Sequence, residues 1–224
     1  MPSQVLSWRT RTNLENSVLT YIRVVDQITS WAGKVFAWCI MIMTFGTAYE
    51  VFVRYLLRDP TSWAFDLSYI MYGTLFMMAG AYTLSRGGHV RGDVVYRLWH
   101  PKTQARVELV LYFFFFFPGI LALIYAGGDY ALESWSYNYG YGEVAISSPA
   151  GVPVSQFKTV IPVAGFLLFI QGIAQVFRCI ICIKTGDWPA HAEDVEEMET
   201  ILLHQKLDDE QIKKELGLAQ GETK

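Results

Sequence analysis

The segment that decides the fold is Trp31–Leu57, which reads WAGKVFAWCIMIMTFGTAYEVFVRYLL. Its charged residues are Lys34, Glu50 and Arg54, and all three lie toward its ends. A helix rises about 1.5 Å per residue, so about 20 apolar residues are enough to cross a hydrocarbon core about 30 Å thick. The segment is therefore predicted to be a transmembrane helix.

Three more apolar segments follow, at residues 63–84, 107–127 and 160–183. The chain has 224 residues, of which 52% are hydrophobic, above the roughly 45–50% of ordinary globular proteins. We therefore predict an all-α integral membrane protein with four transmembrane helices. Its expected parts are an N-terminal amphipathic segment (1–30), a four-helix membrane domain (31–184) and an acidic, partly helical cytosolic tail (185–224).

Basic residues alternate between the loops, and such residues mark the cytoplasmic side of a membrane protein. They precede the first segment, separate the second from the third and follow the fourth: Arg9, Arg11, Arg23 and Lys34; Arg86, Arg91, Arg97, Lys102 and Arg106; Arg178 and Lys184. The loop between the third and fourth segments instead carries Asp129, Glu133 and Glu143. Both termini are therefore expected in the cytoplasm.

The segment before the first span has an apolar stripe with helical spacing, formed by Leu14, Val18, Tyr21, Val25 and Ile28. Asp26 lies off this stripe, as do Glu15 and Arg23. Two interpretations stay open. The segment is either a helix that lies on the membrane surface or against a partner, or a plain extension of the first span.

Charges within membrane spans are costly and therefore indicate function. Glu50 and Arg54 are four residues apart, which places them on one helical face where they can pair. Asp66 begins the second span across the hairpin, so the three are a candidate inter-helix or subunit-interface network. The alternatives are that they only reach the outer membrane surface, or that they coordinate an ion directly.

A glycine-containing turn follows the second span, with Arg86, Gly87, Gly88, His89, Arg91 and Asp93 as a candidate cytoplasmic anchoring loop. Adjacent glycines allow a sharp turn that points these side chains at lipid headgroups or a partner. A phosphate-binding loop is disfavoured, because no Lys-Ser/Thr pair is present and no strand precedes the glycines.

The third span contains five phenylalanines, Phe113 to Phe117, followed by Pro118, where a kink is expected. The segment after it is rich in aromatic residues and glycine and is too polar to span. It either lies along the outer membrane surface or docks an outside partner. The candidate docking residues are Trp135, Tyr137, Tyr141 and Lys158.

No catalytic, cofactor or metal site is expected. Cys179 and Cys182 have only isoleucines between them and no second cysteine pair, which favours ordinary packing. All four histidines fall outside the predicted spans, which disfavours haem and a redox membrane anchor. A stand-alone four-helix channel is a further alternative, but the span interiors offer no ionisable path. No nucleic-acid partner is expected.

Several phrases in this order resemble the small membrane subunit (DctQ type) of the tripartite ATP-independent periplasmic (TRAP) transporters. They are Glu50-Val-Phe-Val-Arg54-Tyr55, Trp63-Ala-Phe-Asp66, Gly87-Gly-His-Val-Arg-Gly-Asp93, and Phe157-Lys158 through Ile161-Pro162 to Gly165-Phe-Leu-Leu-Phe-Ile-Gln171-Gly172. The resemblance covers about residues 31–178. Asp66 departs from the pattern, since a glutamate is common there.

The resemblance implies a scaffold in the cytoplasmic (inner) membrane of a bacterium or archaeon, beside a large membrane subunit (DctM type). That subunit moves an organic acid by an elevator-like mechanism driven by sodium, and a periplasmic substrate-binding protein (DctP type) supplies the solute. The substrate and sodium sites belong to the large subunit. The hairpin charges and the aromatic outer loop are then expected to hold the partners, and the glycine turn to anchor the assembly to membrane lipids.

Overall fold

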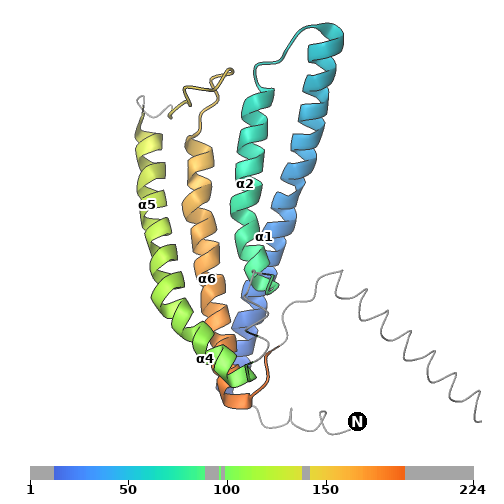
Figure 1. The fold of residues 1–224 in the computed structure, drawn as a ribbon. Coiled ribbons are helices and arrows are strands. Elements are labelled where there is room, and N and C mark those ends of the chain that lie inside the picture. The colour runs from blue at the N-terminus through green and yellow to red at the C-terminus, as the bar shows by residue number, and fades with distance from the viewer. Residues whose placement is uncertain (1–12, 89–95, 97–98, 138–141, 190–224) are drawn as a thin grey trace, which may run out of the picture. The chain divides into compact units, whose positions relative to one another are not determined.

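The computed structural model of the protein describes residues 13–88, 96, 99–137 and 142–189, and side chains from residue 16 onward. This part of the chain is built from helices (Figure 1). They are α1 (Asn13–Phe52), α2 (Ala64–Ser85), α4 (Pro101–Leu111), α5 (Phe117–Ser136) and α6 (Ser155–Thr185). Two π-helical turns continue them: η2 (Val53–Leu57) extends α1, and η3 (Tyr112–Phe116) joins α4 to α5.

Within the described residues, three helices are long and apolar enough to cross a membrane: Asn16–Leu57, Pro101–Ser136 and Ser155–Thr185. They confirm the helical fold class, and by length and composition they are candidates for three of the four predicted spans. The second span coincides with α2, a helix of 22 residues that is not among these three. A fourth membrane span therefore stays a prediction.

The helices extend beyond the predicted spans, because hydropathy marks only the apolar centre of a helix that continues into polar flanks. The largest difference is in α1, which is unbroken from Asn13 to Phe52. Residues 13–30 therefore continue the first span as the same helix, and residues 1–12 lie outside the described part. Of the apolar stripe expected in this segment, Val25 is buried, whereas Ile28 is 46% exposed.

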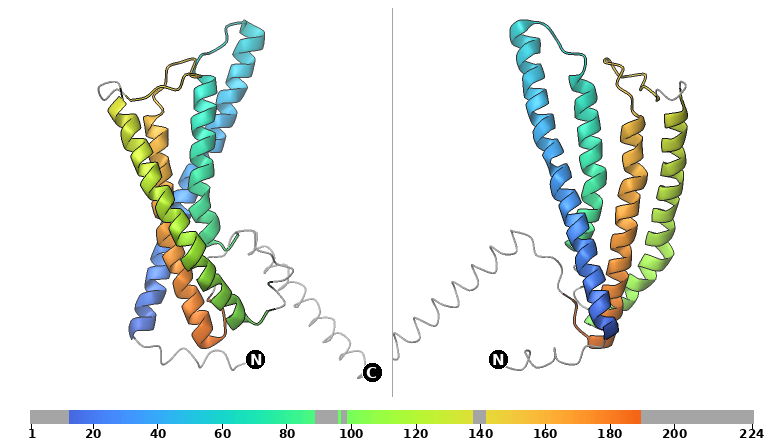
Figure 2. Two further views of the ribbon diagram at one scale, coloured as in Figure 1. Left: turned by 60° about the vertical axis from the view of Figure 1, so that its left-hand side comes forward. Right: turned by 180° about the vertical axis from the view of Figure 1, so that it is seen from behind.

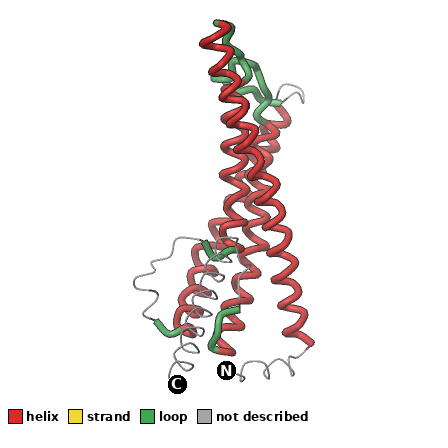
Figure 3. The backbone as a smooth tube through the Cα atoms, turned by 90° about the vertical axis from the view of Figure 1, so that its right-hand side faces the viewer, coloured by secondary structure: helices red, strands yellow, loops and turns green. Residues whose placement is uncertain are grey.

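The helices of residues 13–189 lie in a row in the order α5, α6, α2, α1 (Figures 1 and 2). Helix α6 contacts α1, α2, α4 and α5. At the inner end, where the chain is predicted to be cytoplasmic, α1 crosses α6, and Ile22 and Val25 pack there against Ala174. Viewed edge-on in Figure 3, the outer halves of the helices overlap within one narrow layer.

Glycines allow this close packing between neighbouring helices. A Cβ added to Gly73 of α2 would lie 2.3 Å from the ring of Phe157, and one added to Gly127 of α5 would lie 2.7 Å from Ile161. Small residues let helix backbones approach in a membrane, where lipid provides no hydrophobic force between helices. Large side chains of one helix therefore fill the spaces over the glycines of the next.

The predicted irregularity in the third span is a π-turn. In η3 the N–H of Phe117 donates to the carbonyl of Tyr112, and Pro118 follows at the start of α5. A π-turn and a proline both interrupt the regular hydrogen-bond ladder and bend helices. Figure 1 shows the helix curving here, so that α4 crosses the lower part of α6. Ala105 of α4 packs there against Cys179 and Cys182.

The Gly73 contact gives a test of the row. Gly73→Ala should lower the thermal unfolding temperature of the purified protein, because the new methyl group collides with the Phe157 ring, and such overpacking typically costs about 1–3 kcal/mol. The control is Gly119→Ala, since a Cβ at Gly119 meets nothing within 4 Å. Phe157→Leu should restore part of the loss in the double variant. If Gly73→Ala and Gly119→Ala changed the unfolding temperature equally, the close contact between Gly73 and Phe157 would be contradicted.

Candidate functional site

A polar junction joins α1 to α6 at the inner end of the row. It consists of Asp26 and Thr29 on α1 and of Gln171, Gln175 and Arg178 on α6, and all five are buried. Arg178 donates from Nη2 to Asp26 Oδ2, and Gln171 Nε2 donates to the other carboxylate oxygen at 2.8 Å. Thr29 Oγ1 donates to Gln171 Oε1 at 3.1 Å, and Arg178 Nη1 donates to Gln175 Oε1 at 3.1 Å.

The energetics of this junction are those of a buried ion pair. Arg178 is 0% and Asp26 8% exposed, so neither charge is solvated by water. Arg178 Nε finds no acceptor among the described residues, which leaves the guanidinium dependent on Asp26 and Gln175. Removing one partner of such a pair strands the other charge and typically costs about 3–5 kcal/mol. The junction therefore fixes how α1 crosses α6.

Sequence reasoning missed this junction. It placed Asp26 on the polar side of the N-terminal segment and used Arg178 only as a marker of the cytoplasmic side. One signal was available: Gln171, Gln175 and Arg178 recur at spacings of four and three, which puts a polar stripe on one face of an otherwise apolar helix. A polar stripe inside a membrane helix needs partners, and α1 supplies them.

At the outer end, Glu50 closes the α1–α2 hairpin. Arg54 donates to Glu50 Oε1 from Nε at 2.9 Å and from Nη2 at 2.5 Å. The other oxygen, Oε2, accepts from the backbone N–H of Thr61 at 3.0 Å and from the Thr61 hydroxyl. Arg58 takes a left-handed conformation with φ of 58°, which turns the chain toward Thr61. Glu50 is thus satisfied within its own hairpin.

The structure places Asp66 in a different contact. It lies in the first turn of α2, where the helix dipole favours a negative charge. Its Oδ2 accepts from the Ser148 hydroxyl at 2.7 Å and from the N–H of Ala150 at 3.2 Å. Asp66 therefore ties α2 to the outer loop, residues 142–154, whereas Glu50 and Arg54 pair with each other. The role of these three residues at a subunit interface stays a prediction.

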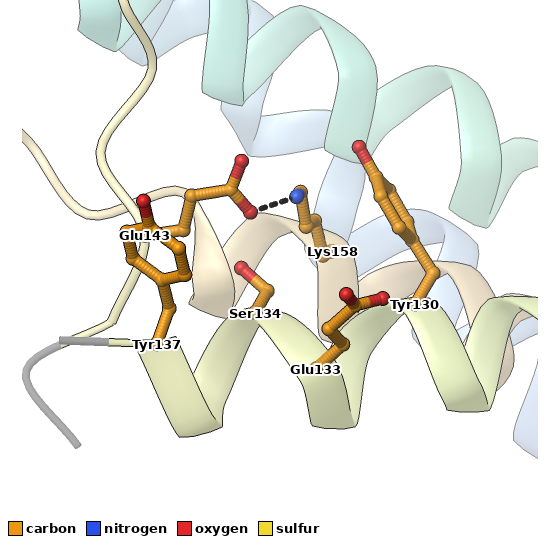
Figure 4. Close-up of a pocket in the computed structure, with 6 residues that line it drawn as sticks. All are labelled: Tyr130, Glu133, Ser134, Tyr137, Glu143 and Lys158. Atoms are coloured by element: carbon orange, nitrogen blue, oxygen red, sulfur yellow. Dashed lines mark hydrogen bonds and ion pairs between the residues drawn. The ribbon is translucent and has the colours of Figure 1, made fainter. Parts of the chain in front are cut away.

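Lys158 holds the other side of the outer loop. Figure 4 shows its ammonium between the carboxylate of Glu143 and the ring of Tyr130. It forms an ion pair with Glu143, and Nζ lies 3.8 Å from the Tyr130 ring centroid, a cation–π geometry. The pocket around it is lined by Tyr130, Glu133, Ser134, Tyr137, Glu143 and Lys158. Donation by Lys158 holds the pKa of Glu143 below its usual range.

The candidate docking residues differ in accessibility. Tyr137 is 64% and Trp135 44% exposed, and Trp135 Nε1 donates to Thr159 at 2.8 Å. Lys158 is only 7% exposed, so its charge faces the pocket. Tyr141 lies outside the described residues. A docking role for the four residues stays a prediction.

Only the first part of the candidate anchoring loop is described. Arg86 donates to the Ser30 hydroxyl of α1 at 3.0 Å and lies 5.3 Å from the Tyr82 ring centroid. Gly87 has φ of 68°, a left-handed conformation that glycine adopts readily, so the chain turns sharply after α2 as expected. His89, Arg91 and Asp93 lie outside the described residues.

The outer-end and inner-end contacts are therefore internal ties of one helical row. Among the described residues, no group of three or more histidine, cysteine or acidic side chains is arranged to hold a metal ion. A sequence model of the family described as "Tripartite ATP-independent periplasmic transporters, DctQ component" matches residues 40–181, more than half of the chain. The chain belongs to the DctQ family. No curated protein matches the chain in sequence.

As a member of the DctQ family, the chain is a small component of a TRAP transporter and works with other TRAP subunits. The DctQ family is a family of transporter components and not of enzymes. The match includes Glu50, Arg54, Asp66 and the α6 side of the inner junction. Asp26 and Thr29 lie before its first matched residue. The α1 half of the inner junction is thus outside the matched region.

The inner junction predicts a strong asymmetry between neighbouring residues of α1. Asp26→Ala should destabilise the detergent-purified protein by about 3–5 kcal/mol, because it strands the Arg178 charge. Gln27→Ala, at an exposed neighbouring position, is the control and should leave unfolding unchanged. Combining Asp26→Ala with Arg178→Leu removes both charges and should recover much of the loss. If Asp26→Ala unfolded with the same free energy as the wild-type protein, the ion pair would not be what holds α1 against α6.

The outer loop should loosen in acid. Glu143 has a lowered pKa in the folded protein, so its contribution is complete above its unfolded-state pKa and is lost as the pH falls through the folded value. Limited proteolysis across this acidic range should show increasing cleavage of residues 142–154 at low pH. Glu143→Gln should be cleaved readily near pH 7 and lose this pH dependence. A cleavage rate of the wild-type protein that does not change with pH would contradict the role of the Glu143–Lys158 ion pair in holding the loop.

Proposed function

We propose that this protein is the small permease subunit of a sodium-coupled TRAP transporter that takes up organic acids. In this proposal it is a scaffold beside a large membrane subunit (DctM type) in the cytoplasmic (inner) membrane of a bacterium or archaeon. The observation that carries the proposal is the DctQ family match, which falls on a row of apolar helices. The substrate class and sodium coupling follow from the family resemblance.

The proposal includes a fourth membrane span and cytoplasmic termini. Helix α2 lies between α1 and α6 in the same row and is long enough to cross, which supports its insertion. The start of α1, the end of α2, the start of α4 and the end of α6 point to the same side of the row, with α2 ending at a higher level than the others in Figure 1. The basic residues Arg23, Arg86, Lys102, Arg106 and Lys184 belong to these helix ends, in agreement with a cytoplasmic position.

A scaffold role is favoured over a solute path within this chain. Transport sites usually combine broken helices with polar groups near the membrane midplane. The ion pairs described above, Asp26 with Arg178, Glu143 with Lys158 and Glu50 with Arg54, instead lie near the two ends of the helices. A row whose large apolar side chains are exposed on α1, α2 and α5 provides surface for lipid and for a larger membrane protein.

The outer loop is proposed to help dock the periplasmic substrate-binding protein (DctP type). Asp66 and Lys158 tether this loop to α2 and α6, so that it is held in one place. Ile146 of this loop is fully exposed, and Trp135 and Tyr137 expose large aromatic surface nearby in sequence. Aromatic and apolar anchors of this kind commonly contribute most to protein–protein affinity. On the cytoplasmic side, the turn at Arg86 and Gly87 is proposed to anchor the assembly at the lipid headgroups.

The proposed function is tested by purifying this chain from its native membrane in mild detergent and identifying what accompanies it by mass spectrometry. A stoichiometric membrane protein with many spans is expected. A chain that purifies alone and transports a solute by itself in liposomes would overturn the scaffold proposal.

The same purification tests the hairpin charges. Glu50→Ala should reduce both recovery of the large subunit and uptake of the organic acid, because Arg54 and the Thr61 turn lose their shared carboxylate. Asp59→Ala, which removes an exposed carboxylate from the same hairpin, is the matched control. Unchanged recovery and uptake for Glu50→Ala would remove the hairpin from the subunit interface.

A further inference from the structure

Helix α1 carries a regular line of exposed apolar side chains along one face. They recur at alternating intervals of four and three residues, and each is between 42% and 69% exposed: Trp31, Val35, Trp38, Ile42, Phe45 and Tyr49. The same spacing continues to Phe52 and Leu56 at one end and back to Ile28 and Val24 at the other. We call this line the α1 seam.

The α1 seam lies on an exposed side of α1. The side of α1 that packs within the chain is marked by the buried residues Ile22, Val25, Thr29 and Ala32. Successive residues of a helix are rotated by about 100°, so the seam runs along a different side of α1 from these positions. At its outer end the seam residue Tyr49, still 53% exposed, stacks on Trp63 just before α2. Helix α1 also lies at the edge of the row, so no other described helix covers this face (Figure 2).

Lipid chains alone do not account for the length of the α1 seam. From Val24 to Leu56 it extends roughly 48 Å at about 1.5 Å per residue. A hydrocarbon core about 30 Å thick covers only about 39 Å of a helix, even at a tilt of about 40°. The exposed cations Arg23 and Lys34 also accompany its inner part, at the level expected for headgroups. The inner residues of the seam therefore need a protein surface to cover them.

The spacing of the α1 seam indicates what kind of surface that is. Contact with lipid imposes no period, whereas two helices that pack along their length require apolar residues every 3.5 residues on average. Within residues 16–52, every exposed aromatic side chain of α1 lies on the seam: Trp31, Trp38, Phe45, Tyr49 and Phe52. Such bulky knobs need a facing helix with small residues between its larger ones.

We propose that the α1 seam binds one long transmembrane helix of the large membrane subunit, crossing it at about 20° in a left-handed pair. The inference rests on the proposed function, since it takes the partner to be that subunit. It adds which face of this chain makes the contact and what the facing helix presents: an apolar stripe with a 3.5-residue period and small side chains opposite the aromatic residues.

Ile42 and Ile40 provide a matched pair for the test. Both are isoleucines of α1, they are 50% and 48% exposed, and their two-residue separation places them about 200° apart around the helix. Only Ile42 is on the α1 seam. The photoreactive residue benzoylphenylalanine is placed at one position or the other, and native membranes containing the full complex are irradiated. Position 42 should form an adduct with the large subunit in several-fold higher yield than position 40.

The other outcomes separate this inference from the proposed function. A large subunit that purifies with both variants but forms no adduct, or forms equal adducts at 42 and 40, would overturn the seam contact and leave the proposed function standing. An adduct between two copies of this chain at position 42 would assign the seam to self-association instead and overturn the inference. Absence of any large subunit in the purified wild-type sample would count against the proposed function itself.

Discussion

Two opposite charges buried between helices have to stay together, because neither can be solvated by water if the other moves away. Asp26 and Arg178 are in this position, and they come from helices that are far apart in the sequence. Their pairing sets where α1 crosses α6. Beyond this crossing, the only helix of the row that runs beside α1 is α2, and α1 therefore lies at the edge with one face uncovered.

Different forces hold the two ends and the middle of the row. In the middle, helices approach through glycines that receive a neighbouring ring or aliphatic side chain, as Gly73 receives Phe157. At the outer end, a polar loop bridges the helices through Asp66 and Lys158. This division follows from the solvent: hydrocarbon gives helices no reason to cluster, so contacts depend on close packing and on polar groups that lack water.

Hydropathy located the apolar centres of the helices, because each segment that crosses lipid must itself be a continuous apolar stretch of sequence. Contacts between segments that are far apart in the chain produce no comparable local pattern. Asp66 was grouped with Glu50 and Arg54 because all three lie at the same membrane end. In the structure, however, Glu50 accepts a hydrogen bond from the nearby Thr61, and Asp66 accepts one from the distant Ser148. The inner junction was missed for the same reason, since nothing local to Asp26 indicates an arginine 152 positions away.

An open row of helices is an unusual solution for a soluble protein, because exposed apolar faces would be hydrated there. In a membrane those faces cost little, and closing the row into a bundle would bring no hydrophobic gain. The polar ties of this chain are directed inward, toward its own helices and loop, while its largest apolar side chains face outward. A subunit built in this way keeps its own arrangement without a partner and still presents a long surface to one. This distribution agrees with the proposed scaffold role, because the contacts that maintain the row are separate from the apolar faces left exposed.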